Sequence, residues 1–196
     1  MTYSVNEWAR KSVHLASSLI PLIYYFGFED RWSALAVLGS LTLIILTAES
    51  LRMVVPVCHR LYLQWFSAII RPREQAARFT GASFVFIGAS LTVILFPKPI
   101  AVAALLFLAI GDPAACLVGR AWGRIRIFNA KTLEGSAAFL VSAILVTSWI
   151  PDIPLPVKIG GALAACLVEL AAFRIDDNLT IPLVSAAVMV ALNGWM

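Results

Sequence analysis

Residues 100–118 read IAVAALLFLAIGDPAACLV, an apolar run interrupted by one acidic residue, Asp112. The run is long enough to cross a bilayer, which takes about 17–25 apolar residues. A carboxylate inside a membrane is costly, so Asp112 should face a polar cavity or a charged partner. Pro113 lacks a backbone donor, and Gly111 loosens the chain beside it. The stretch predicts a helix that breaks at a carboxylate, which either lines a cavity or caps the second half-helix and pairs with an arginine.

The composition of the whole chain also indicates a membrane protein. Apolar residues make up 61% and charged residues 13% of the 196 residues, and the mean hydropathy is +0.89. A soluble fold of this size could not bury so much apolar side chain. Apolar blocks divided by short charged loops exclude disordered and fibrous chains. The first block lacks a small-residue cleavage site, which favours a span over a signal peptide. The three cysteines are far apart and mostly inside apolar runs, so neither a disulfide framework nor a zinc site is expected.

Seven apolar blocks approach spanning length, and together they predict a single all-α membrane domain over residues 1–196. They run about 13–28, 32–48, 81–96, 99–119, 135–150, 157–173 and 179–195. The stretch 53–70 differs, because its polar residues recur at helical spacing and form one stripe on an apolar helix. That pattern predicts a helix lying in the membrane interface or packed over the bundle.

The basic residues predict how these spans are oriented. With seven spans, the N-terminus and the loops after spans two, four and six share one side. That side holds twelve of the fifteen basic residues: Arg10, Lys11, Arg52, Arg60, Arg71, Arg73, Arg78, Arg120, Arg124, Arg126, Lys131 and Arg174. The other side holds Arg31, Lys98 and Lys158. Because basic residues concentrate in cytoplasmic loops, the N-terminus should lie in the cytoplasm and the C-terminus outside. The net charge of +4 then reflects orientation and a local anion site, and no nucleic acid is expected as a partner.

Small and charged residues follow Asp112 in a regular order. Ala115, Gly119 and Gly123 form one helical stripe, and a mixed cluster comes next: Arg120, Arg124, Arg126, Lys131, Glu134 and Gly135. Small residues let phosphates approach the backbone, basic side chains neutralise phosphate oxygens, and carboxylates hold Mg²⁺. The alternative is a helix-packing motif beside a positively charged cytoplasmic loop.

A second acidic cluster lies near the C-terminus. Glu169 falls inside an apolar span near its cytoplasmic end, and Asp176, Asp177 and Asn178 precede the last span. Such hard oxygen ligands suit Mg²⁺ when it also binds phosphate. A turn followed by a helix cap would use the same three residue types, so this cluster has two readings.

The run Asp112-x-x-Ala115-x-x-x-Gly119-x-x-x-Gly123-x7-Lys131-x-x-x-Gly135 resembles the CTP-binding signature of the dolichol kinase, phytol kinase and CTP-dependent diacylglycerol kinase family. The resemblance covers nearly the whole chain. The further matching motifs are Arg10-Lys11-x-x-His14, Glu49-x-x-Arg52, Thr80-Gly81-Ala82-Ser83-Phe84 with Gly88, Glu169, and Asp177-Asn178-Leu179-Thr180-x-Pro182. The chain is shorter than the eukaryotic dolichol kinases and holds only the compact core.

The resemblance implies transfer of the γ-phosphate of CTP to a lipid hydroxyl, giving a lipid monophosphate and CDP, at a site facing the cytoplasm. The expected acceptor is an isoprenoid alcohol of the polyprenol, dolichol or phytol type. Expected Mg²⁺ ligands are Asp112, Glu134, Glu169, Asp177 and Asn178. Expected CTP-binding residues are Ala115, Gly119, Arg120, Gly123, Arg124, Lys131 and Gly135. The base that accepts the hydroxyl proton stays open between Asp112, Asp177 and His14.

Three other functions fit parts of the pattern. A CTP-dependent diacylglycerol kinase would carry out the same chemistry on another alcohol. A phosphatidate cytidylyltransferase would also use CTP and Mg²⁺ but release pyrophosphate. A small transporter could use Asp112 to carry a proton or an ion, although this would not explain why the charged cluster gathers on one face.

Overall fold

The computed structural model of the chain describes residues 5–66, 78–128, 131–171 and 175–194, with residues 5–10 as backbone only. The side chains of Arg10, Arg71, Arg73 and Arg174 and residues 67–70 of the expected interfacial helix lie outside this description.

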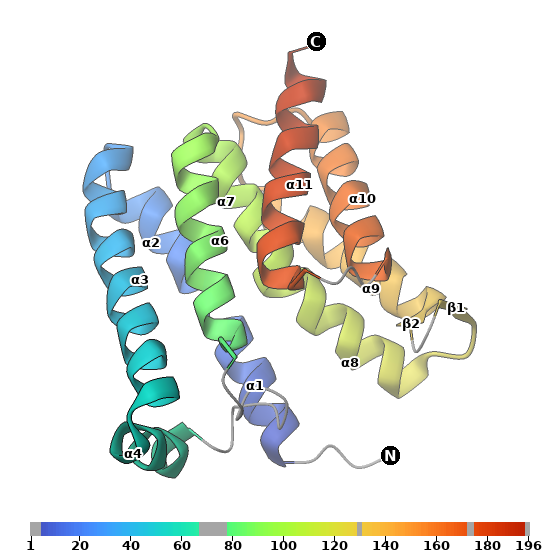
Figure 1. Cartoon of the computed structure of the whole chain (residues 1–196). Helices are drawn as coiled ribbons and strands as arrows, with labels where there is room; N and C mark the ends of the chain where they lie inside the picture. The colour runs from blue at the N-terminus through green and yellow to red at the C-terminus, as the bar shows by residue number, and fades with distance from the viewer. Residues whose placement is uncertain (1–4, 67–77, 129–130, 172–174, 195–196) are drawn as a thin grey trace.

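The described chain is a bundle of helices with one short hairpin (Figure 1). Its elements are α1 (Val5–Ala16), α2 (Leu19–Gly27), α3 (Arg31–Val54), α4 (Pro56–Phe66), α6 (Gly81–Leu95), α7 (Lys98–Leu106), the π-helical turn η1 (Phe107–Gly111), α8 (Asp112–Trp122), β1 (Arg126–Phe128), β2 (Lys131–Thr132), α9 (Leu133–Thr147), α10 (Leu155–Ala171) and α11 (Asp177–Asn193). The antiparallel pair β1–β2 is an addition to the all-α fold expected from the sequence.

The helix predicted to break at Asp112 is instead continuous. α7, η1 and α8 join into one helical run, Lys98–Trp122, and Asp112 has helical dihedrals of φ −63° and ψ −46°. Pro113 cannot donate a backbone hydrogen bond, and a single π-helical turn just before it widens the helix instead of ending it. The Asp112 N–H still donates to the carbonyl of Leu108. The carboxylate therefore sits at a π-to-α junction.

The first predicted span, 13–28, is divided into two helices. α1 ends at Ala16, and α2 begins at Leu19 after a turn at Ser17 and Ser18. Pro21 has no N–H for the carbonyl of Ser17, which accepts from Ile20 at 3.0 Å in a tighter turn. The remaining predicted spans correspond to α3, α6, α7–α8, α9, α10 and α11.

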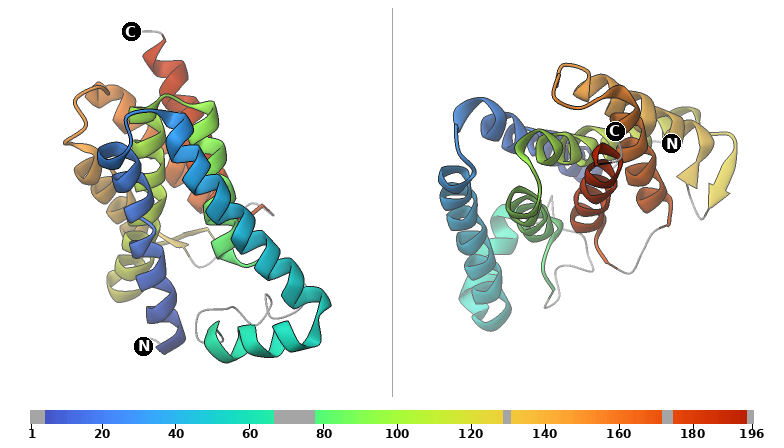
Figure 2. Two further views of the ribbon diagram at one scale, coloured as in Figure 1. Left: turned by 90° about the vertical axis from the view of Figure 1, so that its left-hand side faces the viewer. Right: turned by 90° about the horizontal axis from the view of Figure 1, so that it is seen from above.

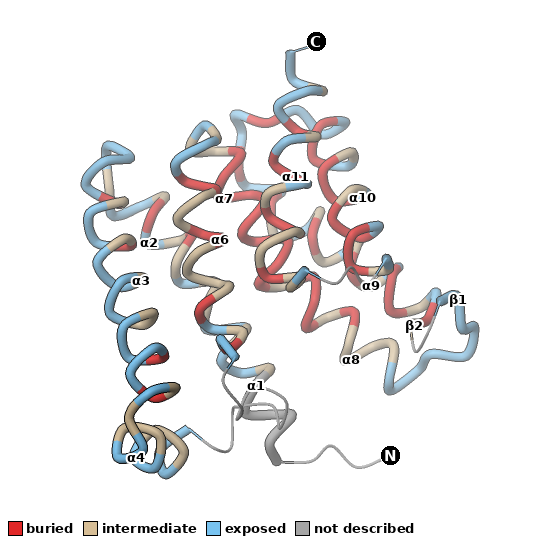
Figure 3. The backbone as a smooth tube through the Cα atoms, in the orientation of Figure 1, coloured by how far each residue is buried: buried red, intermediate tan, exposed pale blue. Residues whose placement is uncertain are grey.

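The central run α7–η1–α8 forms the core of the bundle. α2 packs on α7, α9 packs on η1 and α8, and α10 and α11 pack on each other. Side chains from Ile100 to Ala109 are all buried, and burial is concentrated where these helices meet (Figure 3). By contrast, α3 stands at the edge against α6, with most of its surface exposed (Figures 2 and 3).

α4 crosses the end of α3 as a separate helix, and within the described residues it falls inside the predicted interfacial stretch (Figure 1). Its position at a membrane interface stays a prediction. Among the described helices, Arg31–Val54 and Lys98–Trp122 are long and apolar enough to cross a membrane. The described lengths of α6, α9 and α11 are shorter, so the count of seven spans also stays a prediction.

Candidate active site

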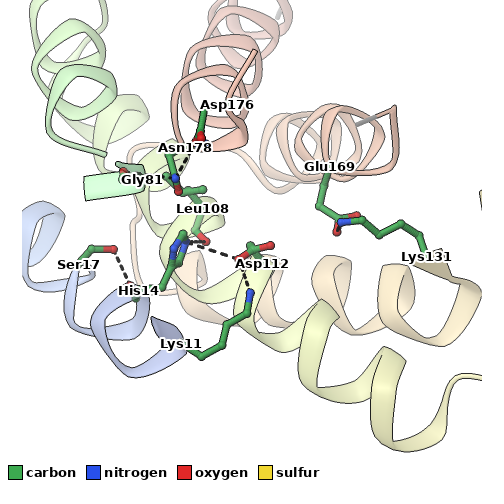
Figure 4. Close-up of polar contacts among 10 residues, drawn as sticks. All are labelled: Lys11, His14, Ser17, Gly81, Leu108, Asp112, Lys131, Glu169, Asp176 and Asn178. Atoms are coloured by element: carbon green, nitrogen blue, oxygen red, sulfur yellow. Dashed lines mark hydrogen bonds and ion pairs between the residues drawn. The ribbon is translucent and has the colours of Figure 1, made fainter. Parts of the chain in front are cut away.

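Asp112 is the centre of the site, and α1 brings two side chains to it (Figure 4). Lys11 Nζ lies 2.8 Å from Asp112 Oδ2, and His14 Nε2 lies 3.7 Å from the same oxygen. Lys11 and His14 are one helical turn apart, so they share the face of α1 that packs against η1. Asp112 therefore pairs with a lysine from the N-terminal helix, whereas the sequence suggested an arginine as its partner.

Burial opposes the charged form of Lys11, but the carboxylate of Asp112 outweighs this effect and raises the pKa of Lys11 above its ordinary value. Lys11 thus remains an ammonium group, and it offers further donors to an anion.

His14 is held by the π-helical turn itself. Its Nε2 lies 3.2 Å from the carbonyl oxygen of Leu108. A carbonyl can only accept, so Nε2 carries the hydrogen in this contact. The hydroxyl of Ser17 donates to the carbonyl of His14 at 2.5 Å, at the turn between α1 and α2. These contacts fix the end of α1 beside Asp112.

The start of α11 supplies a second group of oxygens. Asp176 caps the helix by accepting from the Asn178 N–H at 3.1 Å and from Asn178 Nδ2 at 2.7 Å. Asn178 Nδ2 also donates to the carbonyl of Gly81 at 3.4 Å. Both partners of Nδ2 are acceptors, which fixes the orientation of the amide. Asn178 Oδ1 is therefore a buried acceptor without a hydrogen-bond partner among the described residues.

Asp112, Asp177, Asn178, Lys11 and His14 all line one cavity of about 660 Å³. The helix-capping reading of the Asp-Asp-Asn cluster is correct for Asp176. Asp177 and Asn178 lie on the cavity as well, so the capping reading does not account for the whole cluster.

Lys131 and Glu169 form an ion pair between β2 and α10 (Figure 4). Glu169 is buried, while about a third of the Lys131 side chain is exposed. Figure 4 shows this pair to one side of Asp112. The predicted phosphate ligand and one predicted metal ligand are thus paired with each other at the edge of the Asp112 site.

The stripe of small residues lies where α8 packs on α9. A Cβ on Gly135 would come within 2.8 Å of the carbonyl oxygen of Ala115 and 3.2 Å of Gly119 Cα. A Cβ on Gly119 or Gly123 would lie 2.9 or 2.7 Å from Thr132 Oγ1. This is the helix-packing role that the sequence left open for these residues. Their role in binding CTP is untested by these contacts and stays a prediction.

The remaining predicted residues lie at the exposed end of α8, in the connection before β1 and at the start of α9. Arg120 and Arg124 are exposed. Glu134 accepts the Ile125 N–H at 3.3 Å, which joins the start of α9 to the chain before β1. Hydrogen bonds from its own backbone N–H and from those of Arg124 and Ile125 lower the pKa of Glu134. Within the described residues, no three His, Cys, Asp or Glu side chains form a ready metal cluster.

A buried group around Glu49 has a structural role that the sequence pattern did not predict. Glu49 accepts from the hydroxyl and the N–H of Thr80, the latter at 2.8 Å, and from the Tyr62 hydroxyl at 3.3 Å. Arg52 stacks on the Tyr62 ring at 4.9 Å and donates to the carbonyl of Arg78 at 2.6 Å. The sequence identified Glu49 and Arg52 only as a matching motif, with the two residues three positions apart. Both side chains are in fact almost fully buried, and Glu49, Tyr62 and Thr80 line the same cavity as Asp112.

Comparison with known proteins gives relatives along almost the whole chain. An uncharacterized protein of Rickettsia prowazekii is 32% identical over 186 residues, which cover 90% of each chain. CTP-dependent diacylglycerol kinase 1 of Schizosaccharomyces pombe is 28% identical and covers 94% of this chain and 92% of its own. CTP-dependent diacylglycerol kinase 1 of Saccharomyces cerevisiae is 25% identical and covers 95% of this chain and 73% of its own. No family model matches the chain, and no solved structure matches it significantly.

Proposed function

Because the chain belongs to the same family as the Rickettsia prowazekii protein and is homologous to fungal CTP-dependent diacylglycerol kinases, we propose that it transfers the γ-phosphate of CTP to the hydroxyl of diacylglycerol. The homology supports a CTP-dependent lipid kinase, and it favours diacylglycerol over the isoprenoid alcohol expected from the sequence. The two long apolar helices agree with a membrane protein that acts on a membrane lipid.

The cavity is the main support for this proposal, because charged residues at one end and apolar walls line the same space. Its charged end holds Asp112, Asp177 and Lys11, and its walls include Ile44 and Val85. A phosphoryl transfer to a lipid needs this combination, because a polar nucleotide must meet a hydroxyl whose chains stay in the membrane.

The donor set at the charged end fits Mg²⁺. Asp112, Asp177 and Asn178 face one cavity, and the buried Oδ1 of Asn178 has no described hydrogen-bond partner. Mg²⁺ in nucleotide sites takes one or two carboxylates and completes its shell with phosphate oxygens and water. When bound, Mg²⁺ would neutralise charge on the phosphates. Glu134 and Glu169, the other predicted ligands, have contacts with Ile125 and Lys131.

In the proposed reaction the lipid oxygen forms a bond to the γ-phosphorus of CTP, and the bond from that phosphorus to the β,γ-bridging oxygen breaks. CDP leaves with the bridging oxygen, and the hydroxyl proton passes to a base. Asp112, Asp177 and His14, the three candidates for that base, all line the cavity. Lys11 and Lys131 lie near enough to Asp112 to balance the charge of the phosphates.

The test is an activity matrix with purified protein, Mg²⁺, CTP or ATP, and dioleoylglycerol or phytol. We expect phosphatidate and CDP from the combination of CTP and dioleoylglycerol, and no product from an Asp112→Asn variant that still folds. Release of pyrophosphate when phosphatidate replaces the alcohol in the same assay would identify a cytidylyltransferase. Faster phosphorylation of phytol would restore the isoprenoid alcohol as acceptor, and CTP-independent ion flux in liposomes would favour a transporter.

A further inference from the structure

The walls of the Asp112 cavity come from helices that do not pack closely on one another. Val13 and Ile20 line it from α1 and α2, while Ile44 and Ile45 line it from α3. α2 packs on α7, whereas α3 packs on α6 and α4. Val13 and Ile44 are both exposed, Ile44 by 63%. The cavity therefore has an apolar mouth between α1–α2 and α3.

This mouth opens on an apolar face of the bundle. Leu19 and Ile23 on α2 and Leu41 on α3 are exposed, and both helices line the mouth. Exposed apolar side chains of this kind are stable against lipid and unfavourable against water. In a membrane, a mouth of this kind would give a lipid a route to Asp112 from the side.

The polar lining of the cavity does not stop at Asp112. Asn178 donates to the carbonyl of Gly81, and Gly81 follows Thr80 in the chain. Consecutive Cα atoms are about 3.8 Å apart, so Thr80 lies within roughly 10 Å of the Asn178 amide. Thr80 and Tyr62 then meet at the same oxygen of Glu49. The cavity is therefore lined by a second polar group, Glu49, Tyr62 and Thr80, in addition to the group around Asp112.

Of the two donors in that second group that line the cavity, Tyr62 and Thr80, Tyr62 has the longer contact with Glu49. Its hydroxyl lies 3.3 Å from Glu49 Oε1, longer than an ordinary O–H···O hydrogen bond of 2.5–3.0 Å. Glu49 already accepts two hydrogen bonds from Thr80 and has Arg52 beside it at 3.9 Å. The Tyr62 hydrogen can turn to another acceptor without leaving Glu49 unpaired.

We propose that this cavity binds the acceptor lipid through the mouth between α1–α2 and α3, and that the Tyr62 hydroxyl selects glycerol esters by donating to an ester carbonyl. The inference rests on the proposed function. A diacylglycerol carries ester carbonyls close to its hydroxyl, whereas an isoprenoid alcohol has only hydrocarbon beyond its hydroxyl. With the hydroxyl at Asp112, the esters lie toward Tyr62 and the chains leave through the mouth.

The ester contact is tested by comparing dioleoylglycerol with dioleyl glyceryl ether, which has the same chains and no carbonyls. Tyr62→Phe should raise KM for the ester lipid about fivefold, as expected from the loss of one neutral hydrogen bond. KM for the ether lipid and for CTP should not change. An equal rise for both lipids would show that Tyr62 is only structural, and no rise for the ester would also overturn the assignment.

The mouth is tested without catalysis, using a diacylglycerol with a photoreactive diazirine at mid-chain and protein in nanodiscs without CTP. We expect crosslinks on Ile44, Ile45 or Val85 that excess dioleoylglycerol removes. Ile44→Trp should block them, while the control Leu43→Trp changes the adjacent exposed residue, which does not line the cavity.

Two results would separate the two proposals. Crosslinks spread evenly over the outer helix surfaces, or equal labelling of the two tryptophan variants, would overturn the binding site whatever the enzyme does. Correct labelling in a protein that phosphorylates no lipid with CTP would keep the site and reject the proposed function.

Discussion

Lys131 has two predicted roles, one in stabilising the fold and one in binding CTP, and replacing it should separate the two. It pairs with the buried Glu169, and about a third of its side chain is exposed, so it is free on one side to bind CTP as the sequence predicts. Lys131→Ala should raise KM for CTP at least tenfold and leave KM for the lipid unchanged, because Lys131 does not line the lipid cavity. It should also lower the free energy of unfolding by about 1–3 kcal/mol, since a buried carboxylate loses its partner.

The double variant Lys131→Ala with Glu169→Gln is the control for this prediction. The neutral amide removes the unpaired charge, so thermal stability in detergent should return toward that of the wild type. KM for CTP should remain high if Lys131 binds the triphosphate. Recovery of KM together with stability would show that Lys131 acts only through the fold.

The sequence singled out several residues that line one cavity in the structure, and it missed the contacts between them. Asp112, Asp177, Asn178 and His14 were predicted from the cost of a buried charge, from hard oxygen ligands and from motif resemblance, and they share one cavity. The contact of Asp112 with Lys11 joins residues 101 positions apart, so no local pattern contains it.

At the scale of elements, the packing of α8 on α9 depends on the absence of a side chain at Gly135. A methyl group there would lie 2.8 Å from the backbone oxygen of Ala115. We expect Gly135→Ala to lower the free energy of unfolding by about 1–3 kcal/mol because the backbones must move apart. Gly39→Ala is the control, since a methyl group on Gly39 in α3 meets nothing within 4 Å.

Gly39→Ala should instead stabilise the protein by up to about 1 kcal/mol, because alanine loses less conformational freedom in a helix than glycine. Thermal unfolding followed by circular dichroism in detergent measures both. A Gly135→Ala protein as stable as Gly39→Ala would mean that α8 and α9 do not need this close contact.

Hydropathy predicted the bounds of a helix closely where extended residues separate that helix from its neighbours. The predicted block 81–96 is α6, Gly81–Leu95, since extended residues flank it on both sides. The prediction of one span over 13–28 was wrong, because the turn at Ser17 and Ser18 lies inside an apolar block and does not interrupt the hydropathy. Pro21 lacks the backbone N–H that would continue the helix through this turn. The prediction that the helix breaks at Asp112 was wrong, because a π-helical turn accommodates Pro113 without ending the helix.

At the scale of the whole molecule, the three basic residues on the predicted outer side each bind a backbone carbonyl oxygen. The contacts are Arg31 to Ile94 at 3.3 Å, Lys98 to Phe28 at 2.6 Å and Lys158 to Ile150 at 2.6 Å. They join the connections at the end of the bundle opposite α4 and the hairpin (Figure 1). These three cations therefore have a local structural role, so they do not weaken the charge asymmetry that predicts a cytoplasmic N-terminus.

Single cysteines test this orientation in a protein whose own cysteines have been replaced by alanine. Those cysteines are Cys58, Cys116 and Cys166. Asp152→Cys lies in the exposed connection between α9 and α10, and Ile127→Cys lies in the exposed strand β1 at the opposite end. A membrane-impermeant maleimide should label residue 152 in intact cells and residue 127 only after permeabilisation.

The same two sites also decide where the nucleotide enters. β1 pairs with β2, which carries Lys131, so a cytoplasmic β1 places the charged edge of the Asp112 site on the side where CTP is present. If residue 127 is labelled in intact cells and residue 152 is not, the bundle is inverted. CTP would then face the wrong end of the molecule, and the proposed kinase would have no access to its phosphoryl donor.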